Sequence, residues 1–331
     1  MPSKYFLELF SDGTIFSHRP LTKPMTMSSL NAYPRRLNPW KKLERPIFVV
    51  GSARSGTTFL GTQLGTLPNI LHCPFELKDI WSGEGRVPMA SPKTEDRTNP
   101  YMTGRDVWPG QQKALSRAFF KRMEAVDSEK SARPQCRLLN KNPHLANKIG
   151  LVYSLFPDAH FIWIHRPVLD VVASLKAVFV DVHNRQKAFH VWPDRTVSKL
   201  PRGLHMWRLG DKKFHEESRK FPGGDVSLLA EYWLEANQTI SEGFREIPRG
   251  QTCRVDHSSL LACPVETFRK LCRFLDQPEA YAASMGSAVS DRNGQWRRRL
   301  SDSEIKAVQG FIATHRPAID EIRGGSQIAG I

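Results

Sequence analysis

The chain has 331 residues, 40% of them hydrophobic and 24% charged, and this balance excludes a disordered or fibrous protein. No run approaches the ~20 apolar residues of a membrane span, and residues 1–10 lack the pattern of a secretory signal, so we expect a cytoplasmic protein without a transmembrane segment. The net charge of +15 attracts polyanions in general, whether nucleic acid, a membrane surface, an acidic glycan or a small phosphorylated ligand. Five cysteines, odd in number and widely spaced, argue against a disulfide framework or structural zinc.

The first third of the chain begins with a stretch of low regularity. Residues 1–45 contain several prolines and scattered bases without an apolar period, which predicts an irregular arm. Residues 46–51 (PIFVVG) predict a buried strand, and a Ser/Gly/Thr loop then leads into a helix from Thr57 to about Thr66. A short strand is expected at residues 70–73, whereas residues 82–110 are rich in Gly, Pro and polar residues and indicate a long connection.

A second strand-to-helix unit follows in the middle of the chain. Residues 138–140 resemble the end of a strand, and residues 144–156 have helical spacing. Residues 160–165 (HFIWIH) predict another buried strand, after which Pro167 is well placed in the first turn of a helix. Residues 181–224 are basic and irregular apart from a helix expected near residues 207–218.

The last third adds three helices and one strand, expected at residues 225–244, 265–275, 302–315 and 252–255 respectively. Strands that alternate with helices predict an α/β fold of the P-loop type, with three layers: a central, mainly parallel sheet and helices on both faces. We expect residues 46–331 to form a single domain. Ligands of such folds bind at the carboxyl ends of the strands, where the motifs should lie.

Residues 51–58 (GSARSGTT) match the phosphate-loop pattern G-x-x-x-x-G-K-[ST] at every fixed position except one, where Thr57 replaces lysine. A strand that enters such a loop and leaves it as a helix directs backbone N–H groups at an anion. The missing lysine argues against hydrolysis of ATP or GTP, and Arg54 supplies positive charge within the loop instead. The alternative is a glycine-rich turn that binds nothing.

Residues 54–58 (RSGTT), placed after an apolar strand, resemble the 5′-phosphosulfate loop of the sulfotransferase family. Arg166 and Ser174 stand eight residues apart, like the arginine and serine that bind the donor's 3′-phosphate in that family. A guanidinium that forks onto phosphate oxygens beside a donating hydroxyl suits this role. The likeness covers about residues 46–310, and residues 138–174 particularly resemble the tyrosylprotein and carbohydrate branches.

The resemblance implies an enzyme that moves a sulfuryl group from 3′-phosphoadenosine 5′-phosphosulfate, as co-substrate, to an acceptor hydroxyl, without a metal. The residues that it assigns to the donor are Arg54, Ser55, Gly56, Thr57, Thr58, Arg166 and Ser174. Residues 294–299 (GQWRRR) resemble the last donor-binding segment, in which Arg299 fits best by position, although three arginines can equally be a solvated charge run. Near residues 252–257 a tyrosine of related enzymes is replaced, and His257 stands roughly there.

Sulfuryl transfer needs a base for the acceptor hydroxyl and cations for the charge that develops on the leaving phosphate. The resemblance places Glu76 near the glutamate base of the tyrosylprotein branch, with a spacing from the loop that differs by about one residue. His144, three residues after Lys141, is the rival base. We assign Lys141 and Arg54 as the electrostatic groups. Outside the family context a lone glutamate is usually a solvated carboxylate and a lone histidine a structural residue.

Two other functions compete with this reading. The loop would suit a P-loop phosphotransferase or nucleotide kinase, and the charge would suit a nucleic-acid-binding protein without enzymatic activity, although no nucleic-acid-binding motif is evident. We expect a nucleotide donor and a hydroxyl-bearing acceptor as partners, no nucleic acid, and at most peripheral contact with a membrane. For the acceptor we favour a carbohydrate or glycolipid, because basic loops and Trp192, Trp207 and Trp233 suit it by charge and stacking, unless these tryptophans are core residues.

Overall fold

The structure is a computed structural model, and it describes residues 43–89, 98–184, 188–193, 203–208, 226–290 and 294–324. Most of the predicted arm at residues 1–45 lies outside this described part. So do residues 209–218, the larger part of the helix expected near residues 207–218.

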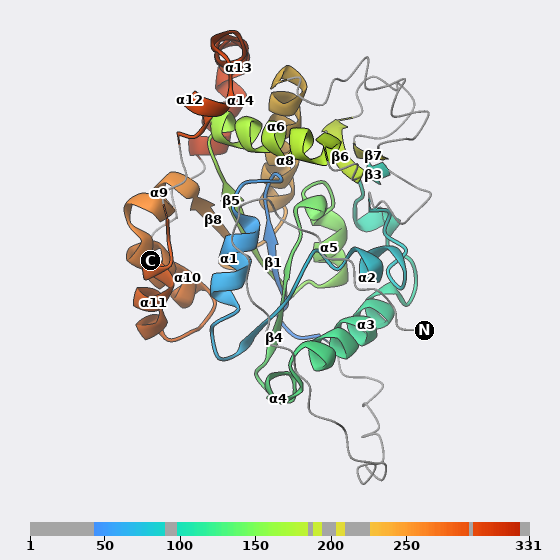
Figure 1. Cartoon of the computed structure of the whole chain (residues 1–331). Helices are drawn as coiled ribbons and strands as arrows, with labels where there is room; N and C mark the ends of the chain where they lie inside the picture. The colour runs from blue at the N-terminus through green and yellow to red at the C-terminus, as the bar shows by residue number, and fades with distance from the viewer. Residues whose placement is uncertain are drawn as a thin grey trace. The chain divides into compact units, whose positions relative to one another are not determined.

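The centre of the fold is a sheet of five parallel strands (Figure 1). From edge to edge these are β2 (Ile70–Cys73), β4 (Arg137–Lys141), β1 (Ile47–Val50), β5 (His160–His165) and β8 (Thr252–Asp256). All four residues of β1 are buried, because side chains of a central parallel strand meet helices on both faces. Its residues alternate between two separate hydrophobic clusters, one on each side of the sheet.

Helices cover both of these faces, which makes the three predicted layers (Figure 1). One cluster joins the sheet to α1 (Thr57–Leu64), α9 (His257–Ala262), α10 (Pro264–Phe274) and α11 (Ala282–Ser287). The other joins it to α2 (Lys78–Ser82), α3 (Gln111–Val126), α5 (Ile149–Leu155), α6 (Val168–Asn184), α8 (Val226–Arg245), α13 (Asp302–Thr314) and α14 (Arg316–Gly324). The α/β P-loop-type fold expected from the sequence is therefore confirmed.

The remaining described elements are short. A small antiparallel sheet has the order β3 (Thr98–Pro100), β7 (Gly203–Arg208), β6 (Ala188–Pro193). Single helical turns are η2 (Gly104–Asp106), α4 (Ser128–Ser131), η3 (Pro143–Leu145), η4 (Arg249–Gln251), η5 (Glu279–Tyr281) and α12 (Trp296–Arg299).

Every strand predicted for the central sheet is present, and the helix expected at residues 302–315 begins at a capping box formed by Ser301 and Glu304. Several details differ, among them strands β6 and β7 within residues 181–224, which were expected to be irregular. The helix expected from residue 144 starts only at Ile149, since Asn142 caps the separate turn η3 before it. Trp207 belongs to strand β7, so the helix predicted there is wrong at its first residues. Helix α3 was not expected, although its buried residues Leu115, Phe119 and Met123 recur at helical spacing.

The strand order creates a crevice at the carboxyl ends of β1 and β5. From β1 the chain passes through α1 to β2 on one side of the sheet, whereas from β5 it continues to β8 on the other side. Adjacent strands whose connections leave in opposite directions form the topological switch point at which α/β folds bind ligands. The loop after β1 and Arg166 after β5 both lie at this point.

Candidate active site

The loop between β1 and α1 is shaped by its two glycines. A Cβ atom on Gly51 would lie 2.4 Å from the carbonyl oxygen of Ile164 in β5, so only glycine allows the loop to leave the sheet this closely. Gly56 caps α1 with φ of 97°, a left-handed conformation that glycine adopts without strain. Within the loop, the Ser55 N–H donates to the Ser52 carbonyl at 3.2 Å. These contacts close the loop over the start of α1.

A residue of α8 holds the loop from outside. The backbone N–H of Ala53 donates to the hydroxyl of Tyr232 at 2.7 Å, and burial raises the pKa of this tyrosine to about 12. Tyr232 therefore stays a neutral phenol at any physiological pH. Sequence reasoning missed this residue, because nothing in its local sequence signals a partner 179 positions away.

The loop arginine reaches the second predicted binding stretch. The Nε atom of Arg54 donates to the Oγ atom of Ser174, in α6, at 3.0 Å. Arg54 has φ of 69°, a left-handed conformation that is uncommon outside glycine, and its side chain is partly exposed. Two of the residues assigned to opposite ends of the donor are therefore in direct contact.

Arg166 follows the last residue of β5 and is held in the same crevice. Its side chain is 12% exposed, and its Nη2 atom lies 3.6 Å from Oδ1 of Asp170, which is in the first turn of α6. The indole of Trp233 fixes its main chain by donating to the Arg166 carbonyl at 2.9 Å. Asp170 also accepts the N–H of Gly294 at 2.9 Å, which ties the segment before α12 to this arginine. Asp170 was not among the predicted site residues.

The other predicted donor residues differ in exposure. Ser55 and Thr57 are buried, whereas Thr58 is exposed on the first turn of α1. Arg299 lies on α12, which packs beside α6 (Figure 1). Its side chain is exposed. Its neighbour Arg297 stacks on Trp296, with the guanidinium carbon 4.4 Å from the ring centre. A donor contact of Arg299 therefore stays a prediction.

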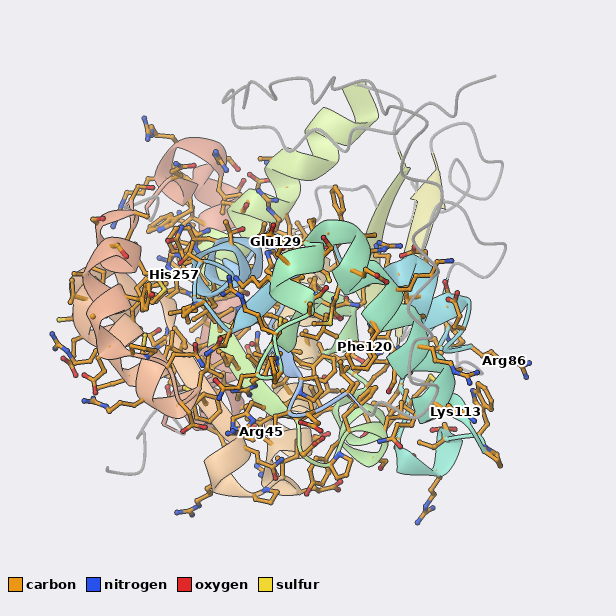
Figure 2. The ribbon with its side chains drawn as sticks, turned by 90° about the horizontal axis from the view of Figure 1, so that it is seen from below. Arg45, Arg86, Lys113, Phe120, Glu129 and His257 are labelled. Carbon is orange, nitrogen blue, oxygen red and sulfur yellow. The ribbon has the colours of Figure 1, made fainter. Side chains whose placement is uncertain are left out.

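His257 lies against the helix end of the phosphate loop. A Cβ atom on Gly56 would be 3.3 Å from Cδ2 of His257, and Figure 2 shows this histidine beside the α1 ribbon. His257 is the first residue of α9, directly after β8. The position that the sequence left doubtful therefore borders the loop, with an imidazole in place of a phenol.

The two predicted catalytic residues Glu76 and Lys141 form an ion pair at the ends of β2 and β4. Lys141 is only 3% exposed, and Glu76 is 16% exposed. Lys141 is the register partner of Val49 in β1, so this pair lies one strand away from the phosphate loop. A buried ammonium and a partly exposed carboxylate thereby lie together at the carboxyl ends of the strands.

His144, the rival base, occupies a different environment. It is 2% exposed within the turn η3, where its backbone N–H donates to Oδ1 of Asn142 at 2.9 Å. His72, in β2, adds an imidazole that the sequence did not single out. Burial, and secondarily the charge of Lys141, lowers the pKa of His72 to about 4. This histidine is therefore neutral near pH 7 beside the Glu76–Lys141 pair.

The described residues contain neither a candidate metal cluster nor a membrane-spanning helix. Within them, no group of three or more His, Cys, Asp or Glu side chains is arranged to hold a metal ion. In the same part of the chain, no helix combines the length and apolar character that crossing a membrane requires.

A glycine-bounded loop between the central strand and its helix, set in the crevice of a parallel sheet, defines a P-loop-type α/β protein. A sequence model of the sulfotransferase family matches residues 46–226, more than half of the chain. The chain therefore belongs to the sulfotransferase family, the family whose chemistry is sulfuryl transfer. The match includes the loop, the Glu76–Lys141 pair and the Arg166–Ser174 stretch, but it distinguishes no branch of the family.

Individual relatives are distant. An uncharacterized protein of Aquifex aeolicus is 24% identical over 248 residues, which cover 71% of this chain and 26% of that protein, so the chain spans about a quarter of this relative's length. Among solved structures, a sulfotransferase of Alicyclobacillus acidocaldarius has 16% identity and a TM-score of 0.48 over 86% of this chain and 96% of its own. One of Mycobacterium avium has 14% identity and a TM-score of 0.47 over 83% and 76%.

Proposed function

We propose that this chain transfers a sulfuryl group from 3′-phosphoadenosine 5′-phosphosulfate to an acceptor hydroxyl. The observation that carries the proposal is the contact between Arg54 and Ser174, because it joins the phosphate loop to the second anion-binding stretch. A donor with a phosphosulfate at one end and a 3′-phosphate on the same ribose needs two such anion sites a short distance apart. A nucleic-acid-binding protein needs no second site of this kind, and Thr57 in place of the loop lysine argues against a nucleotide kinase.

The loop and its neighbours divide the donor between them in this proposal. The N–H groups of Arg54 and of residues 56–58 at the start of α1 bind the 5′-phosphosulfate, since a helix N-terminus favours anions. Arg166 and Ser174 bind the 3′-phosphate from β5 and α6, and Arg299 approaches it from α12. The N–H of Ala53 takes no part, because the hydroxyl of Tyr232 already accepts from it.

In the proposed reaction Glu76 is the base. Its carboxylate takes the proton of the acceptor hydroxyl while the hydroxyl oxygen bonds to sulfur, and the bond from sulfur to the bridging phosphate oxygen breaks. The leaving group is 3′-phosphoadenosine 5′-phosphate, and Lys141 and Arg54 stabilise the negative charge that grows on it. We favour Glu76 over His144, because Glu76 is 16% exposed at the sheet edge whereas His144 is 2% exposed.

For the acceptor we propose a hydroxyl of a carbohydrate or glycolipid. Phe75, the residue before Glu76, is 56% exposed. An aromatic ring beside the base suits stacking against a sugar. Trp233 does not serve this purpose, since it is 2% exposed and donates to the Arg166 carbonyl. The side chains of Trp192 and Trp207 lie outside the described part.

Ligand-induced thermal stabilisation tests the donor assignment. We expect 3′-phosphoadenosine 5′-phosphate to raise the melting temperature saturably, and ATP lacking a 3′-phosphate to raise it much less at equal concentration. Duplex DNA should stabilise the protein only at low salt, because non-specific binding to a basic surface is lost as counterions compete. A larger shift with ATP would favour a phosphotransferase, and a salt-resistant shift with DNA would favour a nucleic-acid-binding protein.

A turnover assay extends the test to the cofactor requirement. Candidate carbohydrate and glycolipid acceptors are incubated with labelled donor, and the sulfated product is identified by mass spectrometry. Because Lys141 and Arg54 supply the cationic charge in this scheme, we expect addition of EDTA to leave the rate unchanged. A rate that EDTA abolishes and Mg²⁺ restores would contradict it.

A further inference from the structure

We infer that Asn140 and Asn142 are positioning residues that hold Glu76 against Lys141, an inference whose catalytic consequence rests on the proposed role of Glu76 as base. Both asparagines are fully buried. Their side-chain amides donate to one and the same acceptor, the backbone carbonyl of Glu76, at 3.4 Å from Asn140 and 2.9 Å from Asn142. One main-chain oxygen thus accepts from both residues that flank the lysine.

The three consecutive residues contact Glu76 from two faces of the sheet. Side chains alternate along a strand, so Lys141 points to the α1 face while Asn140 points to the face covered by α2. Lys141 binds the carboxylate of Glu76, and the two asparagines bind its main chain. Glu76 is therefore fixed at both its backbone and its charged end, and rotation about either point alone cannot move it.

The backbone around Glu76 needs such a restraint. Phe75 has φ of 66° and Leu77 has φ of 53°, so the residues on both sides of Glu76 are in the left-handed conformation that non-glycine residues rarely adopt. Leu77 is anchored in the core, at 2% exposure, but Phe75 is exposed. The hydrogen bonds to the Glu76 carbonyl are thus contacts that stabilise the segment where packing does not.

The orientation of both amides is fixed by their other partners. Oδ1 of Asn140 accepts the indole N–H of Trp81 at 3.0 Å, and Oδ1 of Asn142 accepts the backbone N–H of His144 at 2.9 Å. Since these partners only donate, each amide oxygen must face them, and each NH₂ group is left to face Glu76. The clamp is consequently set by surrounding donors, and the amide groups cannot exchange their roles.

The variant Asn142→Ser tests the clamp directly. Serine can still cap the turn η3 by accepting the N–H of His144, but its short side chain cannot donate to the Glu76 carbonyl. Asn237→Ser is the matched control. Asn237 is also fully buried, accepts an indole N–H, from Trp163, at 3.0 Å and donates to a carbonyl, but it lies in α8.

The first readout is structural and needs no acceptor. Acetic anhydride labels exposed lysines, and mass spectrometry measures the rate at Lys141, which is 3% exposed in its pair with Glu76. We expect labelling several-fold faster in Asn142→Ser and in Glu76→Gln than in the parent, and unchanged in Asn237→Ser. If Lys141 stays as protected in Asn142→Ser as in the parent while Glu76→Gln exposes it, the clamp is refuted.

The second readout is turnover. We expect kcat of Asn142→Ser to fall ~10-fold or more, since small displacements of a catalytic group have large effects on rate, with KM for the donor unchanged. In the double variant with Glu76→Gln, Asn142→Ser should lower kcat no further, whereas a merely structural role would lower it again. Should Lys141 become exposed while Glu76→Gln retains its rate, the clamp is supported and the assignment of Glu76 as base is refuted.

Discussion

The two halves of the proposed site are built in different ways. The donor side, defined as residues 51–58 with Arg166 and Ser174, rests largely on main chain: glycines at 51 and 56 shape the loop, whose backbone N–H groups are the proposed anion donors. The base side, defined as Glu76 with Lys141, is made of side chains 65 positions apart in the sequence. A contiguous motif specifies the first, whereas tertiary packing specifies the second.

This difference predicts how each side fails. On the donor side many small contributions share the binding energy, so a single side chain should have a moderate effect. On the base side a single carboxylate is the proposed proton acceptor, so its loss should have the largest effect in the molecule. The variants below are ordered by that expectation.

Glu76→Gln should lower kcat by roughly 100- to 10,000-fold, the range that a positioned base contributes. The change keeps the size of the side chain and removes the group that accepts the proton, so the affinity for 3′-phosphoadenosine 5′-phosphate should be unchanged by calorimetry. His144→Gln is the comparison, because His144 is the other candidate base. A near-normal rate in Glu76→Gln together with a large loss in His144→Gln would exchange the two roles, and normal rates in both would remove the assignment.

Arg166→Ala should weaken binding of 3′-phosphoadenosine 5′-phosphate by ~10- to 100-fold, since a hydrogen bond to a charged group contributes about 1.5–3 kcal/mol. Arg166→Lys should recover only part of this, because an ammonium cannot fork onto two phosphate oxygens. Arg122→Ala is the control for removing one positive charge, as Arg122 pairs with the exposed Asp79 away from the crevice. Equal losses in Arg122→Ala and Arg166→Ala would mean that net charge alone binds the nucleotide.

The shape of the loop after β1 can be predicted from the sequence for a physical reason. Gly51 and Gly56 are required by close approach and a left-handed φ, and such requirements act on single positions that a pattern can record. Strands β1 and β5 were equally accessible, because each is a short, fully buried run rich in apolar residues. Fold and loop geometry are thus local consequences of local sequence.

The sequence could not reveal the long-range contacts that support the two sides. Tyr232 meets Ala53, and Asn140 meets Glu76, only after distant strands and helices have packed. An isolated tyrosine in an amphipathic helix gives no sign of which face will touch a loop. The helix α3 is a different case, because Leu115, Phe119 and Met123 recur at helical spacing and its pattern is therefore present in the sequence.

Tyr232→Phe should have a smaller effect, which acts on the donor side through the loop. The variant leaves the N–H of Ala53 without its buried acceptor, which costs about 1–3 kcal/mol. We expect a lower melting temperature for the ligand-free protein and several-fold weaker binding of 3′-phosphoadenosine 5′-phosphate, measured by calorimetry. Tyr281→Phe, at a tyrosine that is 38% exposed, is the control and should change neither. Unaltered values in Tyr232→Phe would show that the loop keeps its shape without this anchor.

The smallest expected effect is a loss of stability at acidic pH. It compares His72, beside the base side, with His160 at the opposite end of the sheet. Burial lowers the pKa of each to about 4, from 6.5 for an unfolded histidine. Between these values the unfolded chain binds protons that the folded protein does not, so the free energy of unfolding falls as the pH drops from about 6.5 towards 4.

From pH 6.5 to 5.5 each of the two histidines should contribute a loss of about 1 kcal/mol, measured by urea denaturation at both pH values. His72→Gln and His160→Gln should each remove their own share of this loss, because glutamine does not titrate. The charge of Lys141 lowers the pKa of His72 further, beyond the effect of burial. Lys141→Met should therefore reduce the stability loss due to His72 and leave the loss due to His160 intact. If Lys141→Met leaves the His72 share unchanged, the charge of Lys141 does not act on His72, and the side chains of the base side are not electrostatically coupled.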